Sequence, residues 1–227
     1  MPDSHEGGDQ TPAGHPAIIT FLATAHIAGE LSLLPRLFTL IRQQRQQAEG
    51  PVVLLDLGDT CAADAWVCRA TLGRAPLLVL DSMGYDAAII GGPEAAPIPP
   101  ASLRLLVDQM LMPIIIWNRP RPLTRGGVTF TVAPGQPTAI PTPPVLKVDR
   151  ASPMPPTPGS APVLGDVAQG CLARVDVAWP QWEVLSARML ALDDQTPPDP
   201  TIAAVVALIE HEARQFAQLE GDDHEPE

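Results

Sequence analysis

Four polar residues that could do chemistry each come after a short apolar segment of the chain: His26, Asp59, Glu94 and Asn118. An imidazole and two carboxylates are side chains that bind divalent cations such as Zn²⁺ or Mn²⁺. If the apolar segments are parallel strands, their carboxyl ends meet at one edge of a sheet, where ligands bind in such folds. Chain topology alone then gathers these four residues, whatever the protein does.

The segments that must position these residues alternate between strand and helix patterns. Short apolar runs rich in β-branched residues predict strands at 17–24, 52–57, 87–90 and 114–117. Amphipathic stretches between them predict helices at about 31–47 and at 103–112, and a further helical stretch that ends at about Met83. This order is typical of a parallel sheet with crossover helices, so we expect the α/β class.

The second half of the chain has a different pattern. Residues 113–162 hold 13 of the 28 prolines, so strands there should be short or at a sheet edge, with candidates at 127–133 and 145–148. Residues 171–178 alternate between apolar and polar, and 182–192 are expected to pair with them. Asp199 and Pro200 then have the residue types that cap and open a long final helix.

The composition is that of one folded domain with polar ends. We expect a flexible tail at 1–15, a domain at 16–219 that includes a Pro-rich segment at 119–162, and an acidic tail at 220–227. The net charge is −12, from 14 Lys and Arg against 26 Asp and Glu. This excess of acid disfavours nucleic acid and anionic membranes as partners.

The same sequence gives two expectations about the cellular environment. It shows no signal peptide and no apolar run long enough to span a membrane, so we expect a cytoplasmic protein. Its three cysteines (Cys61, Cys68 and Cys171) are odd in number and form no C-x-x-C pair. We therefore expect small buried thiols rather than a disulfide framework or a structural zinc site.

Three blocks around the candidate residues have a recognisable order and spacing. They are Thr24-Ala-His-Ile-Ala-Gly29, Val53-Leu-Leu-Asp-Leu-Gly-Asp-Thr60 and Met83-Gly-Tyr-Asp-Ala-Ala-Ile-Ile-Gly-Gly-Pro-Glu94. They resemble the 5′-nucleotidase branch of the calcineurin-like metallophosphoesterases, where the blocks read T-N-D-x-H-G, L-L-D-x-G-D-T and M-G-Y-D-A-x-x-x-G-N-H-E. The resemblance covers about residues 17–118 and 163–215. It implies a two-sheet sandwich with a parallel βαβ first half and a trimmed, Pro-rich second half with antiparallel strands.

The resemblance also implies a site that has been altered. Proteins of that family hold two metal ions, and a hydroxide that bridges the metals attacks phosphorus. By the resemblance, His26 stands where the family has a ligand Asp, and Ala28 stands where it has a His. Asp59 matches the Asp that bridges the two metals.

The third block and the later part of the chain have lost further ligands. Gly92 and Pro93 replace the ligand Asn and the His beside it, whereas Glu94 matches. The remaining histidine ligands should lie between the two halves, but residues 119–170 contain no histidine. The ligands that remain are too few to hold two divalent cations, so no cofactor is expected.

The sequence therefore predicts a non-catalytic homologue that acts as a binding or assembly module, with a protein partner or a second copy of itself. On this interpretation Asp59 is a relic or a carboxylate that caps its turn. The alternative is a weak or single-metal phosphoesterase acting on nucleotide-like phosphate esters. In that case His26, Asp59 and Glu94 would hold one Zn²⁺ or Mn²⁺.

Overall fold

The computed structural model of the protein describes residues 18–91, 100–137, 144–152 and 154–222. Its main sheet has the strand order β10-β9-β1-β2-β3-β4. These strands span Glu183–Ala191, Cys171–Ala178, Ile18–Thr24, Val52–Asp56, Ala87–Ile90 and Ile114–Ile116, respectively. The second sheet has the order β5-β6-β7-β8, with strands Arg121–Arg125, Val128–Pro134, Val145–Val148 and Val163–Leu164.

The helices lie where the strand alternation requires crossovers. They are the 3-10 helix η1 (Leu31–Leu33), α1 (Leu34–Gln46), α2 (Trp66–Ala70), α3 (Arg74–Ser82), α4 (Pro100–Gln109) and α5 (Pro200–Asp222). Strands β1 to β4 are parallel, and α1, then α2 with α3, then α4 connect them in turn. Strand β9 is antiparallel to β1, and β10 is antiparallel to β9. The predicted α/β class and the pairing of the two late strands are confirmed.

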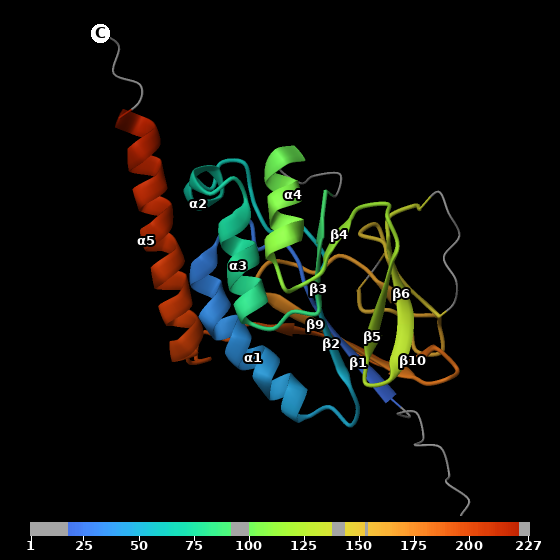
Figure 1. The fold of residues 1–227 in the computed structure, drawn as a ribbon. Coiled ribbons are helices and arrows are strands. Elements are labelled where there is room, and N and C mark those ends of the chain that lie inside the picture. Colours follow the sequence, from blue (N-terminus) through green and yellow to red (C-terminus); the bar gives the residue numbers. More distant parts are fainter. Residues whose placement is uncertain (1–17, 92–99, 138–143, 153, 223–227) are drawn as a thin grey trace, which may run out of the picture.

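The fold has three layers (Figure 1): helices, the main sheet and the second sheet. Side chains of successive residues on β1 and β2 point to opposite faces, as the pleat of a strand requires. Leu22 and Leu54 pack against the helices, whereas Phe21 and Val53 pack against the second sheet. The main sheet is therefore buried on both faces, which explains the nearly continuous apolar runs of its central strands. This is the two-sheet sandwich that the sequence predicted.

The second sheet contains a parallel part that the sequence did not predict. Strands β5 and β6 are antiparallel, but β6, β7 and β8 run parallel to one another. Strand β8 has only two residues, so it carries no detectable periodicity. The parallel pairing matters for function because it directs the carboxyl ends of β7 and β8 to one edge.

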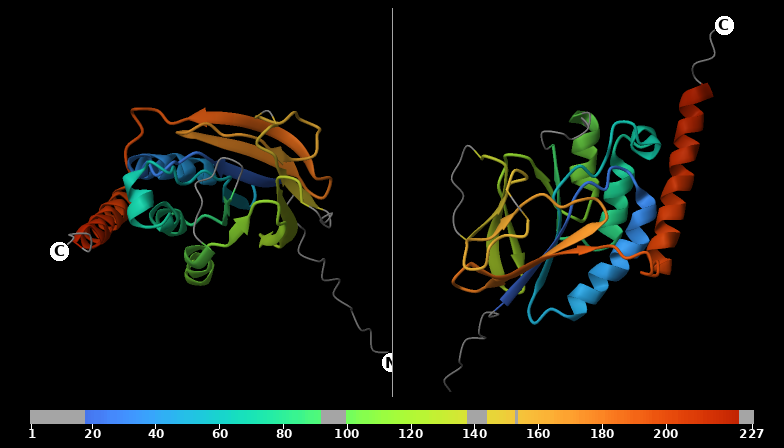
Figure 2. Two further views of the ribbon diagram at one scale, coloured as in Figure 1. Left: turned by 90° about the horizontal axis from the view of Figure 1, so that it is seen from above. Right: turned by 180° about the vertical axis from the view of Figure 1, so that it is seen from behind.

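Helix α5 begins as predicted and covers the outside of the helical layer (Figure 2). The Asp199 side chain accepts hydrogen bonds from the backbone N–H groups of Thr201 and Ile202, at 3.0 and 3.1 Å, which caps the helix. The helix packs against α1, α2 and α3 and continues to Asp222, while residues 223–227 lie outside the described part. Among the described helices, none has the length and apolar character of a bilayer span.

The prediction of three free thiols is wrong for two of the cysteines. Cys61 and Cys68 form a disulfide, with Cα atoms 5.8 Å apart, and Cys171 is a free, partly buried cysteine. A turn closed by the Ala65 N–H on the Ala62 carbonyl brings the two cysteines within bridging distance. A spacing of seven residues has no recognised motif, so only the folded loop reveals the pair.

Candidate functional site

The loops that follow β1 and β2 are joined to each other by their backbones. The N–H groups of His26, Ala28 and Gly29 donate to the carbonyls of Gly58, Asp59 and Thr60, at 3.0, 2.9 and 2.9 Å. These bonds extend the β1–β2 ladder past the ends of the strands. The two loops therefore form one unit at the carboxyl edge of the main sheet.

The backbone turns sharply within this unit. His26, Ala28 and Asp59 have φ angles of 54°, 54° and 52°, in the left-handed region that non-glycine residues rarely adopt. The turns bring two candidate side chains into contact, with His26 Nδ1 lying 3.1 Å from Asp59 Oδ2. Strained backbone of this kind is characteristic of functional sites.

The second sheet supplies two further side chains to the same point. Arg150 follows β7, and its Nη2 lies 2.5 Å from Asp59 Oδ2 and 3.0 Å from His26 Nε2. Asp166 follows β8, and its Oδ1 lies 2.8 Å from His26 Nε2 and 3.5 Å from Arg150 Nε. We call His26, Asp59, Arg150 and Asp166 the edge cluster. It forms where the carboxyl ends of parallel strands from both sheets meet.

The centre of the edge cluster is shielded from solvent. The side chains of Asp59 and Arg150 are each 11% exposed, whereas that of Asp166 is 49% exposed. The ion pair between Asp59 and Arg150 is therefore screened much less than a surface pair would be. Asp59 Oδ1 is buried and has no hydrogen-bond partner among the described residues.

The edge cluster does not fit the two-metal centre that the resemblance implies. A divalent metal would lie about 2.0–2.2 Å from a carboxylate oxygen. The Arg150 guanidinium already contacts Asp59 Oδ2, so a second cation on that oxygen would meet a fixed positive charge. Ala28 offers no donor atom where the family has a His, and no three His, Cys, Asp or Glu side chains in the described ranges form a metal-binding group.

The other two candidate residues do not join the edge cluster in the described part of the chain. Glu94 lies outside the described residues, so the structure does not place it. Asn118 follows β4, and its Oδ1 accepts a hydrogen bond of 2.8 Å from the Gln136 N–H after β6. Its backbone N–H donates to the Pro134 carbonyl, so Asn118 ties the two sheets together.

A buried carboxyl group supports the loop that carries Asp59. Asp56 ends β2 and is fully buried, and it accepts hydrogen bonds from the Thr24 and Thr60 hydroxyls and the Gly58 N–H. Burial raises the pKa of Asp56 to about 7, although these three hydrogen bonds act in the opposite direction. The Thr24 hydroxyl also lies 3.0 Å from the Tyr85 hydroxyl.

Gly29 allows the first loop to lie directly against the disulfide. A Cβ atom at this position would come within 2.7 Å of Ala65 Cβ and 2.9 Å of Cys68 Sγ. The φ of Gly29 is +81°, which an L residue also disfavours. The disulfide loop therefore packs against the loop that carries His26.

Two members of the edge cluster were missed from the sequence. A strand was predicted at 145–148, and the same edge rule used for His26 and Asp59 would have placed Arg150 just after it. Asp166 follows a strand of two residues, for which the sequence carries no periodic signal. The missing information was the parallel direction of β7 and β8.

Comparisons with known proteins agree with this fold. No family model matches the chain. A stretch of 87 residues, 37% of this chain, is 32% identical to an uncharacterized metallophosphoesterase of Bacillus subtilis, YunD, and covers 19% of it.

Solved structures resemble a much larger part of the chain. A 5′-nucleotidase precursor from Thermus thermophilus aligns with 88% of this chain and 60% of its own, at a TM-score of 0.62 and 12% identity. Sulfate thiohydrolase SoxB of the same species aligns with 91% of this chain and 62% of its own, at a TM-score of 0.64 and 12% identity. The calcineurin-like phosphoesterase YfkN of Bacillus subtilis aligns with 89% of this chain and 99% of its own, at a TM-score of 0.61 and 9% identity.

The fold is thus that of the calcineurin-like phosphoesterases, as the structural neighbours show. A stretch of the chain is similar to one metallophosphoesterase, and a 5′-nucleotidase precursor is among its structural neighbours. The chain spans about a fifth of the length of YunD and about three fifths of the first two structures. The activities of those longer proteins are therefore not assigned to it.

Proposed function

We propose that this chain is a non-catalytic metallophosphoesterase homologue that acts as a binding or assembly module. The observation that carries the proposal is the contact of 2.5 Å between Arg150 Nη2 and Asp59 Oδ2. Hydrolysis in this class needs a metal to lower the pKa of bound water. Here the carboxylate that would bridge two metals holds a guanidinium instead, which carries a charge but cannot activate water.

The surface of the helical layer supports a role in protein association. Trp66 on α2 and Leu208 and Phe216 on α5 are 42%, 58% and 45% exposed, and α5 packs directly against α2. Arg214 lies over the Trp66 ring, with its Cζ 5.5 Å from the ring centroid. Large apolar and aromatic side chains flanked by arginine are common in protein interfaces. The partner would be a second copy of this chain or another protein.

Metal content and hydrolysis together test the loss of catalysis. The full chain would be loaded with Mn²⁺ and Zn²⁺, desalted, and measured by plasma mass spectrometry and with p-nitrophenyl phosphate. We expect no stoichiometric metal and no hydrolysis above buffer. Two metals per chain, or metal-dependent hydrolysis that Asp59→Asn abolishes and Asp194→Asn leaves intact, would overturn the proposal. Asp194 is a suitable control because its side chain is 98% exposed and remote from the edge cluster in sequence.

One observation favours the single-metal alternative. Asp59 Oδ1 is buried without a hydrogen-bond partner among the described residues, so one carboxylate oxygen remains open to a cation. His26 lies beside it, while Glu94 lies outside the described residues. One metal per chain, lost in His26→Ala and kept in the exposed His211→Ala, would support this alternative.

Light scattering of the purified chain tests the assembly role. Concentration-dependent association that Leu208→Glu removes, and Leu185→Glu on β10 does not, would identify the helical layer as a self-association surface. A monomer at all concentrations would direct the search to a different protein. The predicted cytoplasmic location also stays a prediction, and the disulfide makes it worth testing, because such bonds are rare in the cytosol.

A further inference from the structure

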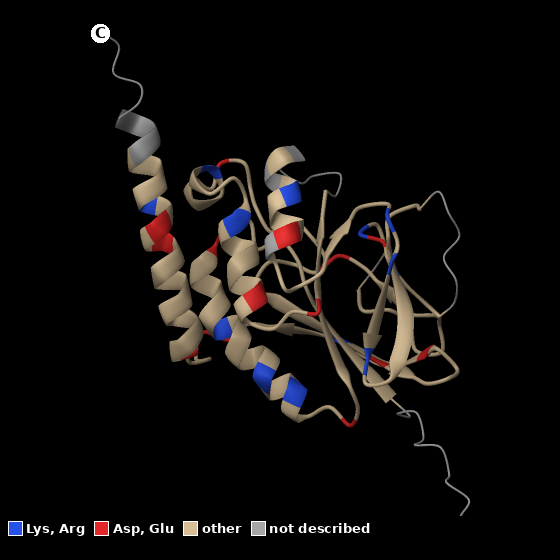
Figure 3. Ribbon diagram, in the orientation of Figure 1, with Lys and Arg blue, Asp and Glu red and all other residues tan. Residues whose placement is uncertain are grey.

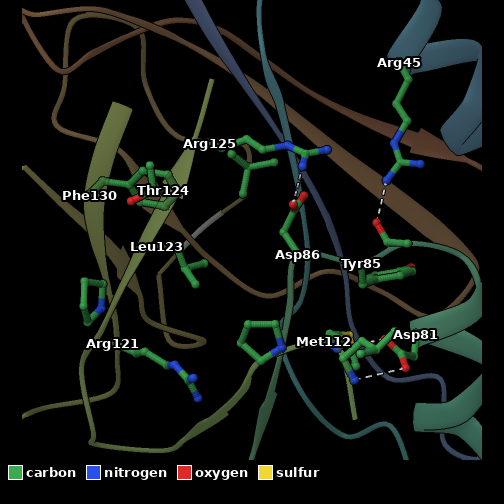
Figure 4. Close-up of a pocket in the computed structure, with 15 residues that line it drawn as sticks. Arg45, Asp81, Tyr85, Asp86, Met112, Arg121, Leu123, Thr124, Arg125 and Phe130 are labelled. Carbon is green, nitrogen blue, oxygen red and sulfur yellow. Dashed lines mark hydrogen bonds and ion pairs between the residues drawn. The ribbon is translucent and has the colours of Figure 1, made fainter. Parts of the chain in front are cut away.

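A second site lies at the opposite edge of the main sheet from the edge cluster. A cleft of about 680 Å³ is lined by residues 84–86, just before β3, by residues 111–113, just before β4, and by strand β5 (Figure 4). Because these loops enter the parallel strands, the cleft is at the amino edge, whereas His26 and Asp59 are at the carboxyl edge. Its volume is within the usual range of about 300–1,000 Å³ for small-molecule sites.

Three arginines line this cleft from two directions. Arg45 comes from α1, and Arg121 and Arg125 come from the two ends of β5; the arginine-bearing parts of α1 and β5 are blue in Figure 3. Each guanidinium is held by a backbone carbonyl. The contacts are Arg45 Nη2 to Gly84 O at 2.8 Å, Arg121 Nη1 to Ile114 O at 3.0 Å and Arg125 Nε to Val52 O at 3.2 Å. A guanidinium has five N–H donors, so these contacts orient the groups with donors to spare for an anion.

The two carboxylates in the cleft are already engaged with the backbone. Asp81 Oδ1 accepts a hydrogen bond of 2.8 Å from the Met112 N–H, and Asp86 Oδ2 accepts one of 2.8 Å from the Leu54 N–H. Asp86 Oδ1 also lies 3.4 Å from Arg125 Nη1, as Figure 4 shows. Three arginines and two carboxylates therefore line the cleft, and both carboxylates already accept backbone hydrogen bonds, one from β2 and one from the loop before β4.

Burial, rather than the neighbouring charges, accounts for the lowered pKa of Arg45. Burial is the largest influence on Arg45 and lowers the pKa of its guanidinium, and the nearby Arg125 lowers it further. Asp86 raises the pKa of Arg45, but not enough to compensate. A bound anion would offset this cost, because an opposite charge favours the protonated form.

The base of the cleft is apolar. Val53, Tyr85, Met112 and Phe130 line it and are at most 4% exposed. Leu123 on β5 is partly exposed, and Figure 4 shows its side chain between Arg121 and Arg125. A ligand that fills the cleft must therefore offer both a charged group and an apolar body.

We propose that this cleft binds a small organic phosphate, with the phosphate on Arg121, which Figure 4 shows apart from both carboxylates of the cleft, and an apolar body over Leu123. Arginine forks match phosphate oxygens in geometry as well as in charge. The cleft is lined by none of the residues of the edge cluster. Binding in this cleft is therefore independent of whether the chain hydrolyses phosphate esters.

Calorimetry on the full chain at low ionic strength tests the proposal with 1-naphthyl phosphate as the probe. Inorganic phosphate and 1-naphthol are the charged and apolar halves of that probe, and each should bind more weakly than the whole. Arg121→Gln should weaken binding roughly 10- to 100-fold, the loss expected for hydrogen bonds to a charged group. Arg121 is exposed, so this variant should fold, and an unchanged urea midpoint would confirm it.

Arg119→Gln is the matched control. Arg119 is exposed and lies two residues away, and it does not line the cleft, so its loss changes the net charge equally. Equal weakening of probe binding by both variants would show that only the net charge matters, and would overturn the proposal. No binding of 1-naphthyl phosphate, or equal binding of 1-naphthol, would also overturn it. Release of 1-naphthol from the probe would contradict the proposed lack of catalysis without affecting the cleft.

Discussion

Replacing Arg150 by methionine tests whether the guanidinium stabilises the buried carboxylate of Asp59. The two side chains are each 11% exposed, and Nη2 and Oδ2 are 2.5 Å apart. Removing one partner of a buried ion pair costs about 3–5 kcal/mol, because the other charge is left without compensation. His26 still contacts the same oxygen at 3.1 Å, so we expect the lower end, about 3 kcal/mol.

A double-mutant cycle separates the interaction free energy of Arg150 and Asp59 from the other effects of the methionine substitution. Asp59→Asn removes the negative charge, and in that background Arg150→Met should cost much less. We expect a coupling free energy of about 2 kcal/mol, within the range for groups in direct contact. Unfolding in urea at neutral pH, followed by circular dichroism, measures all four variants of the cycle.

The pair of Arg36 and Asp194 provides a matched control for this cycle. Its atoms are 3.4 Å apart, but the Asp194 side chain is 98% exposed, so the same two substitutions there should be nearly additive. A stability of Arg150→Met within about 0.5 kcal/mol of wild type, the usual effect of a surface substitution, would show that the guanidinium does not stabilise Asp59. Additive effects of Asp59→Asn and Arg150→Met would show the same, because the coupling free energy would then be zero.

Three further predictions concern the supports of the site. Because burial raises the pKa of Asp56 from 3.8 to about 7, the folded chain keeps a proton that the unfolded chain loses, so stability should fall by up to about 4 kcal/mol between about pH 4 and 7. Urea titrations should show that Asp56→Asn removes this slope, and an equal slope in both proteins would contradict the assignment. Changing Cys61 and Cys68 together to Ser should cost roughly 2–3 kcal/mol for a loop of this length, and alkylation with mass spectrometry before and after reduction should find the bond; three reactive thiols without reductant would rule it out. Gly29→Ala should lower the melting temperature more than Gly127→Ala, because both have positive φ but a Cβ meets nothing within 4 Å at Gly127; equal losses would remove the steric argument.

The sequence predicted the first half of the fold well because its signals are local. Each strand from β1 to β4 is a short apolar run, helix patterns separate these runs, and the run Ala87–Ile90 is the observed β3 without change. The cap of α5 was likewise predictable, since Asp199 acts on N–H groups two and three residues ahead.

The site was predictable only in part, since half of the edge cluster depends on strand direction. His26 and Asp59 follow strands whose parallel order can be inferred from the crossover helices. Arg150 lies 91 positions after Asp59 in the sequence, and it reaches that residue because β7 pairs parallel to β6. No helix in the described part of the chain connects those two strands, so the usual sign of parallel pairing is missing. The disulfide was missed for a similar reason, because it depends on a turn and not on a motif.

The left-handed residues beside the edge cluster have a consequence for protein engineering. A left-handed conformation costs an L residue on the order of 1–2 kcal/mol, and Ala28 carries that cost with only a methyl group. The path of the loops is held by main-chain bonds from His26, Ala28 and Gly29 to the neighbouring loop. Because those bonds do not depend on side chains, the two loops form a ready scaffold onto which ligands could be grafted. A designer who installed Asp and His at positions 26 and 28 would need to clear Arg150, but would not need to redesign the backbone.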